Sequence, residues 1–576
     1  MFNLYKHFVQ IIMKIIVEKL NIINKLIWIV IILTVAFNIV FLMRYNFEAD
    51  SAFYITLAQE QIRTGSLFPE GIYYSTSLFF LTPNLVIIPF LYLTDNLVLA
   101  RQLGILILWL IVYYLLYRLF AVKNNRNITA FIISSSLFSV LYVDSSLVSI
   151  HFYQGAYITF LLFLLMFLVL MNRIIKNGSF GKVEVISIIA LYIIANLGDI
   201  RSLLMWGIPG FLAYACYIYC SNDHDLTSAY ISLKENKIFW IMFDAILLAF
   251  ITWAVVNSHF NTNASTTTIT LVPAKYYGES LYSILIGLLN LYGSSYGSYL
   301  FSQAGIVKIV NFLFAVFMNI ILPVVAIKNY NKIHSETGKF IVIFTLISNI
   351  MYLTVLFLTG RLIFDVVHEY GYNNRYLIAV YNNNILLFSG MISSFLSEKL
   401  KKGLELSVFC VLFYVILNNY FFLSCQKESL INGKYGTFAE GVEGVSEFLV
   451  NKGLRYGYAS FFNAEEYSVL SNNMVRVRSV RFDDNNIFPS NWLTSSSYYD
   501  PRYFTGKTFL MLTENELKQT LSREAINSIL GREIEMLKYK NFYIFVYNYN
   551  ISCNFGRSSE IRGVGVKPDL YSKHFY

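Results

Sequence analysis

Residues 22–50 read IINKLIWIVIILTVAFNIVFLMRYNFEAD, an apolar run that ends a few residues before Asp50. A run of this length can cross the hydrocarbon core of a bilayer as one helix. Four lysines between residues 6 and 25 flank its start, and no small-residue cleavage site follows it. The run therefore predicts a retained signal anchor, Ile22–Met43, whose basic flank stays in the cytoplasm and which places Asp50 on the opposite side.

The composition supports a membrane protein. Hydrophobic residues make up 56% of the 576-residue chain and charged residues only 14%, and the mean hydropathy is +0.54. This leaves too little polar surface to cover a water-soluble body of that size. The net charge of +9 does not indicate nucleic-acid binding, because the cations fall in short clusters between apolar segments.

Further apolar segments bring the predicted number of transmembrane helices to about eleven. They lie near Asn96–Phe120, Ile128–Val143, Phe152–Met171, Val183–Ala195, Leu203–Cys220, Ile238–Val256, Ile306–Ile327, Phe340–Thr359, Tyr376–Leu396 and Leu404–Ser424. Basic clusters occupy alternate connections, on the side of the amino terminus: Arg118/Lys123/Arg126, Arg173/Lys176/Lys182, Lys234/Lys237, Lys328/Lys332/Lys339 and Lys399/Lys401/Lys402. Because a crossing at Leu78–Leu93 would invert this pattern, that proline-containing segment is interpreted as a helix pair lying in the interface.

The composition changes after Ser424 to that of a globular domain, so we divide the chain into a transmembrane module, 1–424, and an extracytoplasmic α/β domain, 425–576. Periodicity predicts a helix at Glu440–Lys452, a strand at Arg455–Ser460, a helix at Asn463–Leu470 and a strand at Val475–Val480. Lys507–Leu512, Glu514–Leu530, Glu533–Tyr539 and Phe542–Tyr547 repeat that alternation. On this topology Cys425 and Cys553 face the oxidising side, and their spacing leaves open whether they are bonded.

Polar residues gather on the outer side, close to the ends of the predicted helices. The first outer loop, 44–95, opens with Asp50 and Tyr54, the second holds Asp144 and His151, and the fourth, 257–305, is long enough to act as a flexible lid. Asp199 and Arg201 in the third are favoured as a structural ion pair. Arg375 and Tyr376 begin a late span.

The order of these features resembles the GT-C superfamily of integral membrane glycosyltransferases, especially bacterial relatives of the protein mannosyltransferases and aminoarabinose transferases. The resemblance rests on Asp50 and Tyr54 after the first span, on Arg375-Tyr376-Leu377 entering a late span, and on a final α/β domain that contains GLRYGYASFFNA at 453–464. It covers the whole chain, although each motif is short.

The resemblance implies transfer of a sugar from a polyprenyl-phosphate carrier to an extracytoplasmic acceptor, usually with inversion. Asp50 matches the catalytic acid of the first loop and would be the general base. Arg375 matches the arginine near the carrier phosphate, although an interfacial anchor explains it equally well. The other candidate substrate- and donor-binding residues are Tyr54, Asp144, His151, Arg201 and Tyr376.

The chain also departs from the family pattern, and these departures leave the substrate open. Ser51 replaces the second acid of many relatives, and Thr76–Pro83 lacks the charged pair of the aminoarabinose transferases. The sugar, the carrier length and the acceptor class (glycolipid, cell-wall polymer or protein) are therefore not identified. Asp50 and Asp144 could hold Mg²⁺ or Mn²⁺, but two acids are a sparse site, and we favour transfer without a metal or other cofactor.

Two other functions remain open at this point. A polysaccharide polymerase or ligase shares many spans and a large outer loop, but generally lacks a terminal α/β domain. A flippase or permease for lipid-linked sugars would need a polar pathway between the helices, which the shortage of charge inside the spans disfavours. All three functions place the protein in the cytoplasmic membrane, with the amino terminus inside and the C-terminal domain outside.

Overall fold

The computed structural model describes residues 29, 31–37, 39, 47, 49–74, 78–120, 125–140, 155, 157–177, 180–222, 225–262, 271–294, 302–360, 362, 375–394, 410–421, 437–483 and 485–556. Within these residues, six helices are long and apolar enough to cross a membrane. They span Leu97–Phe120 (α5), Ile158–Asn177 (α8), Leu203–Ser221 (η3 and α10), Lys237–Asn257 (α12), Gln303–Lys328 (α14, η6 and α15) and Glu336–Thr359 (α16). The chain is thus a helical protein with the composition of a membrane protein.

Each of the six long helices coincides with a predicted span. Shorter helices occupy four other predicted spans: α6 (Asn125–Phe138), α9 (Lys182–Gly198), α18 (Ile378–Ser394) and residues 410–421. Most of the predicted signal anchor lies outside the described residues. The number of about eleven spans therefore stays a prediction.

Neutral side chains hold the middle of the bundle together. Asn349 of α16 donates to Asn384 of α18 at 2.8 Å, and Asn383 donates to Asn349 at 2.9 Å. Asn384 donates in turn to Asn319 at 2.9 Å, in the π-helical segment η6 (Phe317–Ile321). Buried amides that bond one another avoid the cost of leaving a polar group unpaired in an apolar surrounding. We call Asn319, Asn349, Asn383 and Asn384 the amide network.

The first outer loop is an ordered structure built around α3 (Ala49–Thr64). It continues through β1 (Ile72–Tyr74) to α4 (Pro83–Leu91). The expected helix pair at Leu78–Leu93 is wrong, because only one helix forms there. Its nine residues begin at Pro83, where a missing N–H costs nothing, and they are too short to cross a bilayer.

The fourth outer loop is also more structured than a lid. After β2 (Asn261–Thr262), residues 271–294 contain the short turn η5 (Ala274–Tyr276) and the helix α13 (Tyr277–Asn290). Ser280 of α13 donates to the carbonyl of Phe357 at 2.8 Å. The amide of Val272 donates to the carbonyl of Leu358, also at 2.8 Å. These residues pack on the end of α16, and a lid movement of this loop stays a prediction.

The C-terminal domain is a mixed six-stranded sheet in the order β5-β4-β3-β7-β9-β8. Its strands are β3 (Tyr456–Ser460), β4 (Arg476–Asp483), β5 (Asn486–Pro489), β7 (Thr508–Thr513), β8 (Glu535–Tyr539) and β9 (Phe542–Tyr547). Alternate residues of β7 enter opposite cores: Phe509 and Met511 pack with α20 (Thr437–Asn451), whereas Leu510 and Leu512 pack with α23 (Arg523–Leu530). The period of two explains why this sheet is buried on both faces.

The predicted mixture of helices and strands is present in this domain, but one helix is divided, and the strict alternation is wrong at its end, where β8 and β9 are consecutive strands. Glu514–Leu530 forms two helices, α22 (Glu514–Gln519) and α23, rather than one. Thr513 caps the first through a reciprocal bond with Glu516, and Ser522 caps the second. Two N-cap signals in one continuous stretch favour two helix starts. Short elements complete the domain: η9 (Phe461–Asn463), α21 (Glu465–Leu470), β6 (Thr494–Ser495), η10 (Ser496–Tyr499) and η11 (Ile551–Asn554).

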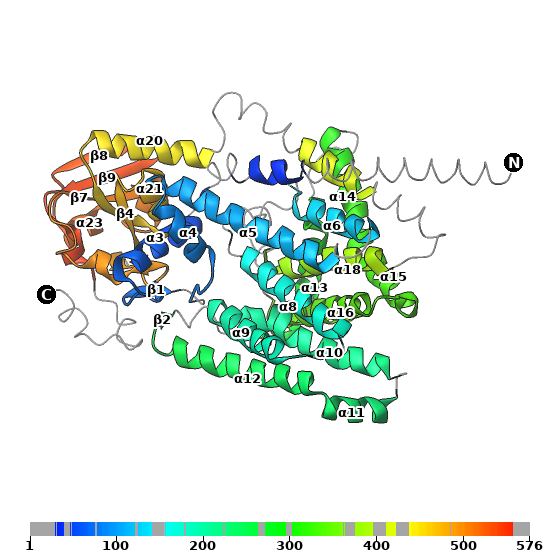
Figure 1. Cartoon of the computed structure of the whole chain (residues 1–576). Helices are drawn as coiled ribbons and strands as arrows, with labels where there is room; N and C mark the ends of the chain where they lie inside the picture. Colours follow the sequence, from blue (N-terminus) through cyan, green and yellow to red (C-terminus); the bar gives the residue numbers. More distant parts are fainter. Residues whose placement is uncertain are drawn as a thin grey trace.

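Three distant segments of the chain join in a small sheet beside the bundle. β1 of the first loop pairs with β2 of the fourth loop in parallel and with β6 of the C-terminal domain in antiparallel orientation. The amide of Leu97, at the start of α5, also donates to Asn472 of the C-terminal domain at 3.0 Å. The domain therefore sits at the end of the bundle where α5 begins and α12 ends (Figure 1). The remaining helices are α11 (Leu226–Glu235) and η7 (Tyr330–Lys332).

Candidate functional site

Asp50 lies in the first turn of α3, where the positive end of the helix dipole favours a carboxylate. Burial raises the pKa of its carboxyl above the ordinary value, and the nearby charge of Arg375 acts in the opposite direction. These two residues are distant in sequence, so the fold brings together the predicted base and the predicted phosphate-binding arginine.

Arg375 begins the short turn that leads into α18. Its guanidinium lies over the ring of Tyr376, 5.3 Å from the ring centre. Its Nε is buried and has no hydrogen-bond partner, and within the described part of the chain Arg375 forms no direct ion pair. Asp50 and Arg375 thus act on each other electrostatically, without a direct ion pair between the two side chains.

Tyr54 lies one helical turn after Asp50 and is buried. Burial raises the pKa of its phenol, and the charge of Asp50 adds to this, whereas Arg201 and Arg101 act to lower it. The ring of Tyr54 meets that of Phe79 edge to face at 5.6 Å. Tyr54 therefore lies within electrostatic range of both Asp50 and the arginines Arg101 and Arg201.

Arg201 and Asp199 form the predicted structural ion pair. Arg201 Nε donates to the two oxygens of Asp199 at 3.0 and 2.9 Å, and Nη2 approaches Oδ2 at 2.5 Å. Arg201 Nη1 also donates to the hydroxyl of Tyr157 at 3.0 Å, just before α8. Asp199 therefore neutralises the charge of Arg201, and the remaining nitrogen of the guanidinium bonds the aromatic side chain of Tyr157.

A small hollow of about 60 Å³ opens between these groups. Tyr54, Phe80, Thr82, Phe160, Asp199 and Arg201 contribute to its wall. This volume holds a few water molecules rather than a sugar ring. A substrate as large as a sugar would therefore have to extend beyond the hollow.

Sequence reasoning missed Arg101, which is buried on α5 with its guanidinium 5.3 Å from the ring centre of Phe47. The available signal was an arginine in the second turn of the apolar Leu97–Phe120 run, well before the basic end at Arg118, because ionisable residues at membrane depth are rare. Tyr157 was also not selected, although it bonds Arg201. Its contact could not be deduced from spacing, because the two residues are distant in the chain.

Two predicted site residues, Asp144 and His151, lie outside the described residues, and so does Cys425. Cys553 is an exposed, free thiol. Among the described residues, no three His, Cys, Asp or Glu side chains form a group that could hold a metal ion. Asp144 is one of the two predicted metal ligands and lies outside the described residues. Binding of Mg²⁺ or Mn²⁺ by Asp50 and Asp144 therefore remains an open prediction.

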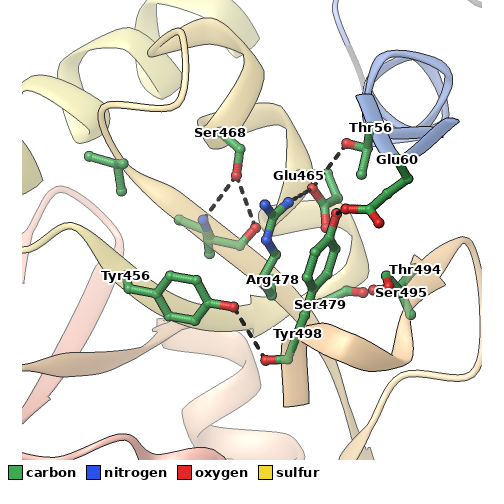
Figure 2. Close-up of polar contacts among 12 residues, drawn as sticks. Thr56, Glu60, Tyr456, Glu465, Ser468, Arg478, Ser479, Thr494, Ser495 and Tyr498 are labelled. Atoms are coloured by element: carbon green, nitrogen blue, oxygen red, sulfur yellow. Dashed lines mark hydrogen bonds and ion pairs between the residues drawn. The ribbon is translucent and has the colours of Figure 1, made fainter. Parts of the chain in front are cut away.

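A second charged group joins α3 to the C-terminal domain. The guanidinium of Arg478 on β4 lies 2.6 Å from the carboxylate of Glu465 on α21, and both side chains are buried. Thr56 and Glu60 of α3 reach the same group (Figure 2): Thr56 donates to Glu465 at 3.3 Å, and Tyr498 donates to Glu60 at 3.1 Å. We call Thr56, Glu60, Glu465, Arg478 and Tyr498 the interface cluster.

The interface cluster is tightly packed. The guanidinium carbon of Arg478 lies 3.8 Å from the centre of the Tyr498 ring, and the carbonyl of Tyr498 accepts from the hydroxyl of Tyr456 at 3.2 Å. The helix that begins with Asp50 is therefore fixed to the C-terminal domain one to three turns further along.

Comparison with known proteins gave no assignment: no protein-family model matches the chain, and no curated protein matches it significantly.

Proposed function

We propose that the protein is an integral membrane glycosyltransferase that moves a sugar from a polyprenyl-phosphate donor to an acceptor outside the cytoplasm. In this proposal the site lies at the outer membrane boundary, where a lipid-linked donor can keep its chain in the bilayer. The carrying observation is that the fold brings Asp50 within electrostatic range of Arg375, beside a hollow lined by aromatic and cationic groups.

The proposed reaction assigns one task to each side of the site. Asp50 takes the proton of the acceptor hydroxyl while that oxygen bonds to the anomeric carbon of the donor. The bond from that carbon to the phosphate oxygen breaks, and the polyprenyl phosphate leaves with the electron pair. Arg375 stabilises the departing phosphate, because a guanidinium can bind two of its oxygens at once. Attack opposite the leaving group inverts the anomeric centre.

The surrounding residues support this division. Arg201 and Arg101 add positive charge near Tyr54, which offsets part of the negative charge that a carrier phosphate would bring. Tyr157 and Tyr376 contribute aromatic surface and hydroxyl groups at the same level. In this arrangement Arg201 is a positioning residue, because Asp199 already neutralises it.

Transfer can be tested with purified full-length protein in detergent, given polyprenyl-phosphate sugars and a set of cell-envelope acceptors. Release of polyprenyl phosphate together with a mass gain of one sugar on the acceptor would support the proposal. Consumption of no donor, by protein that is folded and monodisperse, would contradict it. Mass spectrometry of envelope glycans with and without the gene would narrow the donor and acceptor set.

The proposed orientation needs its own test. In a variant without native cysteines, a cysteine at the exposed position Ser528 should react with an impermeant thiol reagent in intact cells, and one at Ser221 should not. The reverse pattern would place Asp50 on the cytoplasmic side and remove the extracytoplasmic acceptor.

The alternatives receive less support. A flippase needs polar groups that line a path, but the side chains of the amide network bond one another across the helices. A polymerase or ligase would use the same boundary position for Asp50, and it would be distinguished by transfer of a preassembled chain rather than one sugar.

A further inference from the structure

A second cavity lies in the C-terminal domain, where β3 and β4 begin. Its volume is about 400 Å³, within the range of small-molecule sites. Its lining includes Arg455, Asn473 and Arg476, together with the apolar side chains of Val450, Met474 and Phe504. The cavity is separate from the site around Asp50 and Arg375, and the function proposed above gives the cavity no role.

The cavity lies at the amino end of β3, opposite the end of that strand that meets α3. The carboxyl end of β3 leads to Phe461, which packs in the same apolar cluster as Phe53 and Leu57 of α3. The cavity is at the opposite end of that strand. Five residues of β-strand separate the two ends by roughly 15 Å, so one group could not serve both places.

Two cations meet at this end of the strands with no acidic partner among the described residues. Arg455 and Arg476 are exposed and adjacent, since the amide of Arg476 donates to the carbonyl of Arg455 at 2.8 Å. Neither side chain forms an ion pair or a hydrogen bond with another described residue. Other arginines of the domain do have carboxylate partners: Arg478 with Glu465, Arg502 with Asp500 and Arg523 with Glu533.

The rest of the wall suits a saccharide better than a bare ion. Phe504 is half-buried and stacks on Tyr456 at 4.7 Å, which fixes its ring at the cavity. Met474 is 60% exposed and adds an accessible apolar side chain to the wall. Asn473, held in a left-handed turn at φ 62°, can donate to and accept from hydroxyl groups.

From these observations we propose that the cavity binds an anionic saccharide, one that carries a carboxylate or phosphate group. Arg455 and Arg476 bind the anionic group, Asn473 bonds sugar hydroxyls, and Phe504 with Met474 covers the apolar face of a sugar ring. In an enzyme of the proposed function, this site holds a remote unit of the acceptor. That identification of the ligand as acceptor rests on the proposed function, whereas the binding itself does not.

The test is direct binding to full-length protein in a non-ionic detergent. The probes are trigalacturonate, its neutral counterpart trigalactose, glucose 6-phosphate and inorganic phosphate. We expect at least one charged saccharide to bind about tenfold or more tightly than both the neutral sugar and inorganic phosphate. Equal binding of inorganic phosphate would overturn the saccharide proposal in favour of a general anion site, and binding of none of the probes would overturn it altogether.

Variants assign the binding to this cavity. The double variant Arg455→Gln/Arg476→Gln should weaken binding about tenfold or more, whereas the control Arg532→Gln removes an exposed arginine elsewhere on the domain and should not. Unchanged binding in the double variant would refute the site. Asp50→Asn should bind the saccharide normally. If the wild-type protein binds the saccharide but transfers no sugar from any donor, the proposed function is rejected and this inference is kept.

Discussion

α3 carries charged groups at both ends, and the two ends differ in how those charges are paired. Glu60, near its C-terminal end, belongs to the interface cluster, in which Arg478 and Glu465 are 2.6 Å apart. Asp50, at its N-terminal end, feels the charge of Arg375 without an ion pair to it. A closed pair holds structure together, whereas an open pair leaves room for a ligand. The comparison predicts that separate substitutions at the two ends of α3 reduce stability and turnover independently.

The largest expected effect is on stability, at the closed pair. Glu465→Ala leaves Arg478 buried and uncompensated, so unfolding should become easier by about 3–5 kcal/mol. Thermal unfolding of the purified chain would measure the loss. Removing both charges, as Glu465→Met/Arg478→Met, should recover much of it, and Glu514→Ala at an exposed pair should change little. If the single variant melts like the wild type, the interface cluster is not a structural connection.

At the open pair we expect the largest effect on turnover. Asp50→Asn keeps the shape of the side chain but not its basicity, so turnover should fall by about a hundredfold or more, while the melting temperature holds. Steady-state transfer with saturating donor and acceptor measures this. Asp95→Asn, at an exposed acid of the same loop, is the matched control. Transfer at the wild-type rate by the Asp50 variant would exclude it as the base.

Arg375→Lys should have a smaller effect. The charge stays but the two-pronged contact with phosphate is lost, so KM for the donor should rise about tenfold. Unchanged kinetics would reduce Arg375 to an interfacial anchor.

The pH dependence probes the same pair. Burial holds the pKa of Asp50 above 3.8 and Arg375 opposes that rise, so the base is lost as pH falls through the shifted pKa. In Arg375→Gln the opposing charge is absent, and the acid limb of kcat/KM should move to higher pH. In Arg375→Lys it should stay in place. If the acid limb of kcat/KM does not move in Arg375→Gln, a group other than Asp50 controls the pH dependence.

The smallest effect is expected in the amide network. Asn349→Leu removes two interhelical bonds, and such bonds contribute about 0.6 kcal/mol each on average. A slight fall in melting temperature with normal transfer would fit a packing role. A strong loss of transfer at normal stability would instead connect the network with the reaction or with transport.

The sequence predicted elements better than it predicted contacts. Apolar length located all six long helices, and a period of two located β3, β4 and β7, because both signals are local. Three features were missed, namely the division of 514–530, the single helix α4 and the packed helix α13. Each depends on a cap, a proline or a distant packing partner. At the site, Asp50 and Arg375 could be selected one by one, but the approach of Tyr157 to Arg201 depends on tertiary packing.

The small sheet β2-β1-β6 has a consequence for the order of biosynthesis. Its first strand is made early and its last, Thr494–Ser495, comes only after the helical module has been synthesised. At ordinary translation speeds that interval is on the order of a minute. During that time β1 lacks its antiparallel partner, and Thr56 and Glu60 lack the domain that covers them. A nascent or truncated chain would thus expose this edge to chaperones and proteases, and completion of the domain would close it.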